Sequence, residues 1–528
     1  MKQTIPQPVL DVAAALTAGG FEAYLVGGCV RDLLRGAVHG ERVEPKDWDI
    51  ATNARPEEIQ KACPDSVYEN EFGTVGVKIR TNDLQPTTDN KDSATKSGKL
   101  ANDKQATTDV IEVTTYRVDG TYHDHRHPEE VQFAARIEDD LARRDFTVNA
   151  MAVRITNNKW FIPSSGEGQQ TTNDITDPFD GHVDLKAKVI RAVGNPTLRF
   201  REDALRLLRA VRFAAELGFS IEDATGQAIQ AESRLLEEIA PERVRDELVK
   251  LIMAPRAASG IRMLEGYRLL AYIIPELREG IDCGQNKHHI YTVFDHNVRA
   301  LDYAAGKGYP LHIRLGALLH DVGKPRTKRG DGPDSTFYNH EVVGGRMTRV
   351  IMERLKFSTE VADAVTHLVR QHLFYYNVGE VSAAGVRRFI ARVGIEMVDD
   401  ILKVREADRI GSGVPKAFPY KLRHLQFMID KVRHDPVHPK MLALRGDELM
   451  RLVGAPPGPV VGQILRILLD EVLEEPSRNS KEYLERRARV LHALPPADLA
   501  PLDRAARSHV EELEADAEEV LKRRHHVS

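Results

Sequence analysis

Asp203, Arg206, Arg209 and Arg212 recur at three-residue steps in a segment, 200–212, whose apolar residues predict a helix. Residues three apart are neighbours on one slowly winding helix face, so Asp203 and Arg206 are placed to act together. An ionised Asp accepts from an exocyclic amine, and an Arg donates to a ring nitrogen. Cytosine and adenine present that amine beside an acceptor nitrogen, whereas guanine and uracil present the reverse pattern. The pair could therefore select C and A without a template; the alternative is a solvated arginine-rich helix.

A glycine pair, Gly27-Gly28, follows the short apolar run 23–26 and precedes a helical pattern. Glycines let backbone N–H groups approach a ligand closely, and a helix N-terminus favours negative charge, so such a turn can cradle phosphates. Arg31 would add a charge-assisted contact at the start of the helix. The pattern is common among strand-to-helix connections, and by itself it is a weak signal.

Two carboxylates, Asp47 and Asp49, are two residues apart on a predicted strand, which directs both to the same face. Mg²⁺ prefers such oxygens, and a two-metal site stabilises the attacking and leaving oxygens of a displacement at phosphorus. Glu112 lies on a later predicted strand, on the face opposite to Ile111 and Val113, and could join the two aspartates. A surface turn with two aspartates is the alternative.

Two further polar segments could contact a nucleotide or cover it. Residues 119–128 contain Gly, Asp and His without a regular apolar pattern, which predicts a loop. Arg143 and Arg144 precede a short apolar run and suit triphosphate or ribose oxygens. Asp145 or Asn149 could accept a sugar hydroxyl, and a solvated basic turn is the alternative.

Taken in order, these segments resemble the class II tRNA nucleotidyltransferase and poly(A) polymerase family, of the bacterial CCA-adding type. Residues 25–32 with 47–49 look like its catalytic motif, 143–150 like its ribose motif, and 202–206 like its amino-acid template. The resemblance implies Mg²⁺ held by Asp47 and Asp49, with Glu112 assisting. It also implies a set of nucleotide-binding residues: Gly27, Gly28, Arg31, Arg144, Asp203, Arg206, Arg209 and Arg212.

The reaction that this resemblance implies is attack of a tRNA 3′ hydroxyl on the α-phosphorus of CTP or ATP, with pyrophosphate leaving. Members restricted to adding C lack an intact loop before the ribose motif, whereas residues 119–128 are intact here. We therefore expect either complete CCA addition or addition of the terminal A alone. The alternatives are a poly(A) polymerase acting on generic RNA and a phosphohydrolase acting on RNA ends or nucleotides.

A second constellation, in the later half of the chain, looks like an HD-domain metal site. His320-Asp321 closes an apolar helical pattern, with His296 upstream and Asp408 downstream. These nitrogen and oxygen ligands suit Mn²⁺, Ni²⁺, Fe²⁺ or Mg²⁺. The resemblance implies either a metal-dependent phosphohydrolase or a fold kept for packing, and chance clustering must be weighed among 20 histidines. Ligands for a second ion, or for phosphate, could come from two more histidines, His340 and His372.

Composition sets the broad class of the protein. A length of 528 residues exceeds one hydrophobic core, so several domains are expected. A formal net charge of −5 argues against indiscriminate nucleic-acid binding, so an RNA substrate must use local basic surface. Three cysteines without metal-binding spacing fit a reducing cytoplasm. Neither a signal peptide nor a membrane span is expected, and the sequence leaves the oligomeric state open.

Periodicity predicts an α+β multidomain protein, with an α/β head on a small mixed or antiparallel sheet and an all-α body. The head is expected over residues 1–160, and its polar stretch 81–108 reads as a disordered insertion. A small hairpin is expected at 174–193. The remaining divisions are a connector with nucleotide-reading helices at 161–280, an HD domain at 281–415 and a helical tail, with a possible tRNA contact, at 416–528.

Overall fold

The computed structural model describes residues 5–40, 43–45, 47–70, 73–80, 108–119, 131–155, 175–286, 290–433 and 442–525. Contacts divide the chain into two compact units, Met1–Arg370 with Gly411–Gly413 and Gln371–Ile410 with Val414–Ser528. Most of the expected insertion and most of the expected loop at 119–128 lie outside the described residues. The finer division into four domains stays a prediction.

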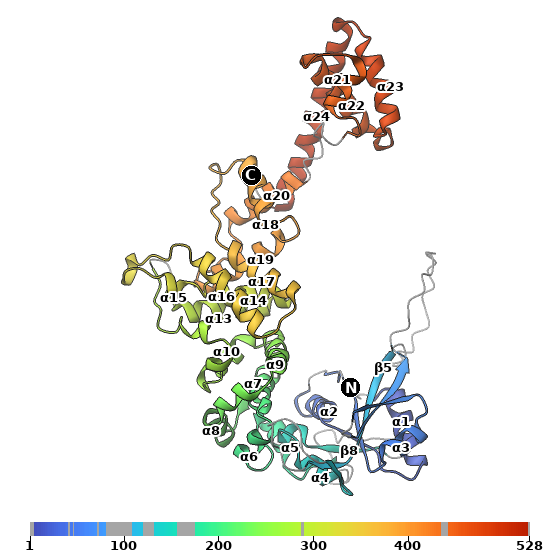
Figure 1. Ribbon diagram of the computed structural model, residues 1–528, viewed down its shortest axis with the longest axis vertical. Helices are drawn as coiled ribbons and strands as arrows, with labels where there is room; N and C mark the ends of the chain where they lie inside the picture. Colours follow the sequence, from blue (N-terminus) through green and yellow to red (C-terminus); the bar gives the residue numbers. More distant parts are fainter. Residues whose placement is uncertain are drawn as a thin grey trace. The chain divides into compact units, whose positions relative to one another are not determined.

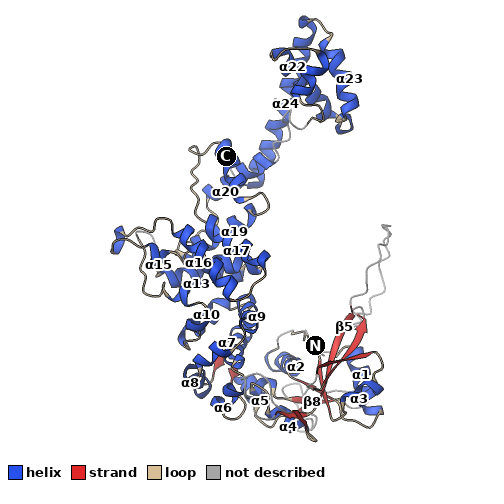
Figure 2. Cartoon of the chain, in the orientation of Figure 1, coloured by secondary structure: helices blue, strands red, loops and turns tan. Residues whose placement is uncertain are grey.

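The head is built on a mixed sheet with the strand order β3-β4-β5-β2-β1-β8-β9. The β2–β5 pair is parallel and the other neighbouring pairs are antiparallel, so the expected α+β class is confirmed. Figure 2 shows these strands in red. The strands of the sheet are β1 Tyr24–Val26, β2 Asp49–Thr52, β3 Ser66–Asn70, β4 Thr74–Arg80, β5 Thr108–Thr115, β8 Ala152–Arg154 and β9 Ile175–Thr176. A separate two-stranded sheet joins β6 Arg117–Asp119 to β7 Val131–Phe133.

Apolar side chains from the head helices and the sheet form one core. Val9, Leu16 and Val30 come from helices, and Ile50 and Val113 come from strands; all are fully buried. The head helices are α1 Gln7–Ala18, α2 Gly28–His39, α3 Pro56–Ala62, α4 Ile137–Ala142 and the 3₁₀ turn η2 Thr147–Asn149. This core packs against the strands β2 and β5, which carry the candidate site residues Asp49 and Glu112.

The chain after the head is mainly helical, and the first of these helices are shown in green in Figure 1. The central helix α7, Leu205–Leu217, is buried along most of its length and packs on α9, Pro241–Met253, and α10, Ala257–Gly266. It ends at Gly218, whose φ of 72° suits glycine at a left-handed cap. The neighbouring elements are α5 Gly181–Ala187, β10 Val189–Ile190, α6 Pro196–Glu202, β11 Ser220–Ile221, α8 Asp223–Ala231, η4 Ser233–Glu238, α11 Leu270–Ile273 and α12 Pro275–Arg278.

The first unit continues through the region expected to be an HD domain. Its longer helices are α13 Val293–Gly306, α14 Leu311–Leu319, α16 His340–Arg354 and α17 Thr359–Gln371, with the short α15 Lys324–Thr327 and η5 Gly332–Asp334. The second unit contains α18 Ala383–Val393, α19 Val398–Gly411, α20 Tyr420–Arg433, α21 Gly446–Val453, α22 Pro459–Glu474, η7 Pro476–Arg478, α23 Lys481–His492 and α24 Pro496–His525. No helix among the described residues is both long and apolar enough to span a bilayer.

Two local expectations were wrong. The segment 200–212 is not one helix, because Asp203 has an extended backbone between α6 and α7, and its Oδ1 accepts a hydrogen bond from Leu205 N. A side chain that bonds nearby backbone in this way competes with helix continuation. The expected hairpin at 174–193 is the helix α5 instead, with β9 and β10 belonging to different sheets.

Candidate functional site

The candidate active site begins at the turn between β1 and α2. Gly27 has a φ of 76°, a left-handed conformation that favours glycine. A Cβ on Gly27 would lie 3.0 Å from Arg144 Nη1 and 3.3 Å from Asp49 Oδ2. The bare backbone of this turn therefore allows a carboxylate and a guanidinium to lie directly against it.

Strand pairing brings two of the three expected carboxylates, Asp49 and Glu112, to one edge, whereas Asp47 lies before β2 and outside the strand on which it was expected. Asp49 starts β2 and pairs in register with Glu112 of the parallel strand β5, so their side chains share a face. Glu112 is exposed between the buried Ile111 and Val113, as the alternation predicts. Asp47 is exposed two residues before Asp49 and raises the pKa of the Asp49 carboxyl through its charge.

The electrostatics of Asp49 fit a cation-binding carboxylate. Burial raises the pKa of the Asp49 carboxyl, the Arg144 guanidinium lowers it, and the Asp47 charge raises it further. Protein groups alone do not fully balance the negative charge of an ionised Asp49, and a divalent cation would supply the missing positive charge. Within the described residues, the Arg144 Nε atom is buried without a hydrogen-bond partner, and its Nη2 donates to Asp140 Oδ2 at 3.2 Å.

A chain of polar contacts joins the glycine turn to helix α7. Arg31 Nη1 donates to Asn149 Oδ1 at 2.9 Å, and Asn149 Nδ2 donates to Asp145 Oδ1 at 3.2 Å. The other Asp145 oxygen, Oδ2, lies 2.6 Å from Arg209 Nη2. Arg209 Nη1 lies 3.9 Å from Glu247 of α9. The turn at Gly27, the segment 143–150 and helix α7 are therefore held by one network.

The two residues expected to read the base lie at the start of α7 and are held by neighbours. Asp203 Oδ2 lies 3.2 Å from Arg243 Nη2. Arg206 Nη1 donates to Glu202 Oε2 at 2.7 Å, and its Nη2 donates to the Arg143 carbonyl oxygen at 3.0 Å. Because guanidinium carries five N–H donors, Arg206 can hold these contacts and still present donors to a ligand.

The two later arginines of α7, Arg209 and Arg212, are paired with acidic residues. Arg212 is 8 % exposed, and its Nε donates to Glu247 Oε2 at 2.9 Å while its Nη1 donates to Glu216 Oε2 at 2.8 Å. Its guanidinium carbon also lies 3.6 Å from the centre of the Phe213 ring, within cation–π range. Acidic residues hold both Arg209 and Arg212, and direct contact with a nucleotide stays a prediction for both.

A second cluster gathers imidazoles in the first unit. His296 Nε2 lies 2.8 Å from His320 Nε2 and 3.1 Å from Asp321 Oδ2, and all three side chains are buried. His320 Nδ1 lies 2.8 Å from the Ala317 carbonyl oxygen, a pure acceptor that places the ring proton on Nδ1. His320 Nε2 is then a lone-pair donor, as a metal ligand requires.

Two more residues complete the surroundings of Asp321. His340 Nε2 lies 3.3 Å from Asp321 Oδ1, and Lys324 Nζ lies 2.6 Å from Asp321 Oδ2. Burial alone would raise the pKa of the Asp321 carboxyl, but Lys324 and His320 hold that pKa well below its usual range. The ionised carboxylate and the converging imidazole nitrogens suit a first-row divalent ion.

The remaining expected ligands, Asp408 and His372, belong to the second unit and are both buried there. Arg405 Nη1 donates to Asp408 Oδ2 at 2.6 Å. Gly411, which ends α19 but belongs to the first unit, has no room for a side chain, because a Cβ would lie 2.7 Å from the His296 carbonyl oxygen.

Comparison with known proteins decides the family. A "Poly A polymerase head domain" family model matches residues 23–109 and 93–191, one described as "Probable RNA and SrmB- binding site of polymerase A" matches 218–281, and a tRNA nucleotidyltransferase domain 2 model matches 342–488. A CCA-adding enzyme of Enterococcus faecalis is 30% identical over 91% of this chain and 96% of its own length. The chain belongs to the tRNA nucleotidyltransferase and poly(A) polymerase family.

Other members of this family agree in sequence and in fold. An A-adding tRNA nucleotidyltransferase of Deinococcus radiodurans is 38% identical over 64% of this chain and 76% of its own length. The crystal structure of the Bacillus stearothermophilus CCA-adding enzyme in complex with CTP covers 92% of this chain and 98% of its own, with 26% identity and a TM-score of 0.54. The chain is therefore an enzyme of the nucleotidyltransferase class, as its motifs predict.

Three acidic or basic residues of this nucleotidyltransferase, Glu202, Arg243 and Glu247, make contacts that were not predicted from the sequence. Glu202 stands four residues before Arg206, a spacing at which a helical ion pair is expected, so a local signal for it existed. Arg243 and Glu247 carry no such signal, because their partners Asp203 and Arg212 lie 40 and 35 residues away in the sequence. They follow only from the packing of α9 on α7.

We expect Asp145→Asn to lower the free energy of unfolding of the nucleotidyltransferase by about 2 kcal/mol at neutral pH. Burial would raise the pKa of Asp145, but the charge and hydrogen bond of Arg209 lower it to about 2 from a usual value of 3.8. A lowered pKa stabilises the fold above the usual value, and this stabilisation is lost as pH falls from 3.8 through 2. Urea unfolding of the variant and the parent protein at several pH values measures this difference in the free energy of unfolding.

The control for this prediction is Asp246→Asn, which alters an exposed carboxylate on α9 paired with Arg245. An exposed pair of this kind contributes less than about 1 kcal/mol. The account is wrong if both variants lose the same stability, or if the loss in Asp145→Asn does not shrink in acid.

Proposed function

We propose that this chain adds C and A nucleotides, or the terminal A alone, to the 3′ ends of tRNA from CTP and ATP, without a nucleic-acid template. The observation that carries the proposal is the close approach of Asp49 and Arg144 to the side-chain-free turn at Gly27. That arrangement sets a cation-binding carboxylate and a phosphate-binding guanidinium against backbone able to accept a triphosphate. We place the reaction in the cytoplasm.

In the reaction that we propose, the 3′ hydroxyl oxygen of tRNA forms a bond to the α-phosphorus of the nucleotide. The bond between that phosphorus and the bridging oxygen breaks, pyrophosphate leaves, and the hydroxyl proton is lost. Asp47 and Asp49 would hold Mg²⁺, with Glu112 beside them; the ion, when bound, stabilises charge on the attacking and leaving oxygens. The turn Gly27-Gly28 would cradle the phosphates.

The remaining residues orient the nucleotide. Arg31 and Arg144 would bind its phosphate and sugar oxygens, and Asp203 and Arg206 would accept and donate at the base edge. Arg209, Arg212 and Glu247 would keep α7 fixed against the ribose motif, so that the base-reading pair meets a nucleotide held at the turn. Extension of a tRNA lacking CCA, in the presence of labelled CTP or ATP, tests this function directly.

We also propose a second activity, hydrolysis of phosphoesters at a metal centre that includes His296, His320 and Asp321. The convergence of the two Nε2 atoms at 2.8 Å supports it, because a divalent cation would replace the proton that one neutral ring otherwise donates to the other. Mn²⁺, Ni²⁺, Fe²⁺ or Mg²⁺ would polarise the phosphoester when bound.

His320→Ala should reduce the metal that copurifies with the protein by at least about 10-fold and abolish hydrolysis of a 2′,3′-cyclic nucleotide, because it deletes a ligand. Elemental analysis and phosphate release measure the two effects. Asp49→Asn should retain both the metal and the hydrolysis. His492→Ala, at an exposed histidine of α23, is the matched control. Unchanged metal content in His320→Ala would contradict the metal centre.

A further inference from the structure

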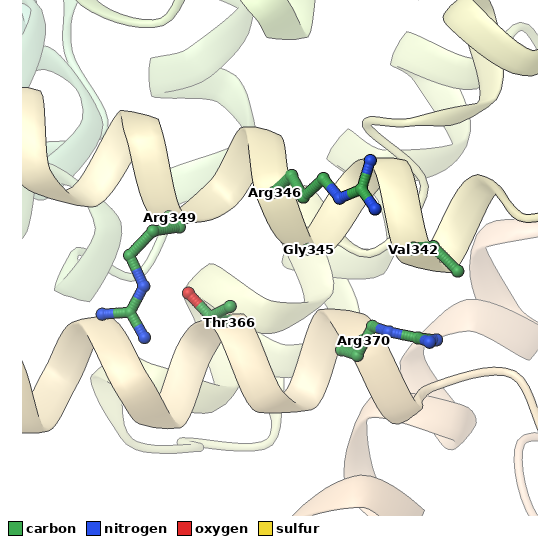
Figure 3. A pocket seen from close by; sticks show the side chains of 6 residues that line it. All are labelled: Val342, Gly345, Arg346, Arg349, Thr366 and Arg370. Carbon is green, nitrogen blue, oxygen red and sulfur yellow. The ribbon is translucent and has the colours of Figure 1, made fainter.

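A groove of about 530 Å³ runs between α16 and α17 and is lined by three arginines. Figure 3 shows Arg346 and Arg349 on α16, and Arg370 and Thr366 on α17. The lining is completed by Val342 and Gly345. The groove involves none of the residues assigned to the nucleotide site or to the histidine cluster.

Glycines on α16 set the width of this groove. A Cβ on Gly345 would lie 3.4 Å from both Cβ and Cδ of Arg370, and one on Gly344 would lie 3.3 Å from Val369 Cγ1. The two helices therefore approach closely, and the stem of Arg370 lies across Gly345. This close approach brings the arginines of the two helices to the same groove.

The charges of the groove are unevenly compensated. Arg349 is paired with Asp363, and Arg370 Nη1 lies 3.5 Å from Glu341 Oε1. Arg346 is exposed and has no acidic partner among the residues that the structure describes. The groove thus carries the unneutralised guanidinium of Arg346, together with the guanidiniums of Arg349 and Arg370, which acidic residues already orient.

A hydroxyl adds a polar group to the lining. Thr366 Oγ1 is buried and, in the described part of the chain, makes no hydrogen bond. Figure 3 shows it on α17 between Arg349 and Arg370. A buried hydroxyl without a partner is unfavourable, and a ligand oxygen would satisfy it. Guanidinium and hydroxyl donors together match the oxygens of a phosphate.

We propose that this groove binds the phosphodiester backbone of the tRNA substrate. Arg346 and Arg349 are three residues apart on one helix and Arg370 faces them, so their donors are spread along the groove and can bind successive phosphates. The whole chain has a net charge of −5, so RNA binding must use local basic surface such as this one. The proposal rests on the tRNA-extending function and names a surface that serves it.

The test compares tRNA binding by the full chain and by Arg346→Ala across a series of KCl concentrations. Arg346 makes no ion pair with any residue that the structure describes, so its replacement should leave the fold intact. We expect the dissociation constant for CCA-lacking tRNA to rise about fivefold at 0.1 M KCl, and the slope of log affinity against log salt to fall by about 0.7 to 0.9. Arg346→Lys should restore most of the slope.

Two controls separate this proposal from its alternatives. Lys307→Ala removes an exposed cation at the end of α13 and should change neither quantity. The KM for CTP should not change in Arg346→Ala, because the groove would hold RNA and not the nucleotide. Equal salt slopes for Arg346→Ala and the parent protein, or a change confined to the CTP KM, would overturn the groove assignment. Failure of the parent protein to extend tRNA would instead overturn the proposed function.

Discussion

Asp49→Asn is expected to lower the rate of nucleotide transfer by at least about 1,000-fold, equivalent to about 4 kcal/mol of transition-state stabilisation. The substitution keeps the size of the side chain but removes the negative charge that a divalent cation needs. Asp49 lies in register with Glu112 and against the Gly27 turn, which places its carboxylate where we propose that the cation binds. Single-turnover incorporation of labelled nucleotide measures the effect.

The same variant should be as stable as the parent protein, or slightly more stable. Burial raises the pKa of Asp49, so its ionised form is unfavourable in the folded protein without a cation. Thermal unfolding in EDTA tests this. Asp65→Asn, at an exposed aspartate in the head, should leave both rate and stability unchanged. Transfer within tenfold of the parent rate in Asp49→Asn would show that Asp49 is not a metal ligand.

Asp203→Ala and Arg206→Ala should each raise misincorporation of U and G, relative to C and A, by about 10-fold to 100-fold. A lost base-edge contact reduces discrimination by about 1–3 kcal/mol. Arg206 is held by Glu202 and by the Arg143 carbonyl oxygen, and Asp203 by Arg243. The pair is therefore oriented before the nucleotide arrives, which increases its power to discriminate.

Competition between the four nucleotides on one tRNA, read by sequencing the products, measures this selectivity. Arg234→Ala, at an exposed arginine of η4, provides the control. If Arg206→Ala transferred nucleotides slowly but kept the selectivity of the parent protein, Arg206 would hold neighbouring residues in place and would not read the base.

The parts of the fold that follow from local sequence were predictable. The pair Gly27-Gly28 indicated a turn after a buried strand, and the alternation around Glu112 indicated which face that residue would take. These patterns arise within a few residues. They explain why the head sheet and the gathering of Asp49 with Glu112 agree with expectation, while the catalytic role of these residues stays a prediction.

The contacts between distant segments were not predictable from local patterns. Arg212 looked like one more ligand-binding arginine, yet Glu247 of α9 holds it, and nothing in the sequence near Arg212 indicates that partner. The helix breaks at Asp203 because the Asp203 side chain accepts a hydrogen bond from the backbone N–H of Leu205. The pattern of apolar residues does not predict such a hydrogen bond. The groove at Arg346 likewise exists only because α16 and α17 pack through Gly345.

Nucleotide addition is decided with tRNA transcripts that end just before CCA, after the first C and after the second C. Each is mixed with the full chain, Mg²⁺ and CTP, ATP or both, and product length is read at single-nucleotide resolution. The account predicts ordered addition of C, C and A, or of A alone on the transcript ending in CC. No extension of any transcript, or long A tails on unrelated RNA, would contradict it.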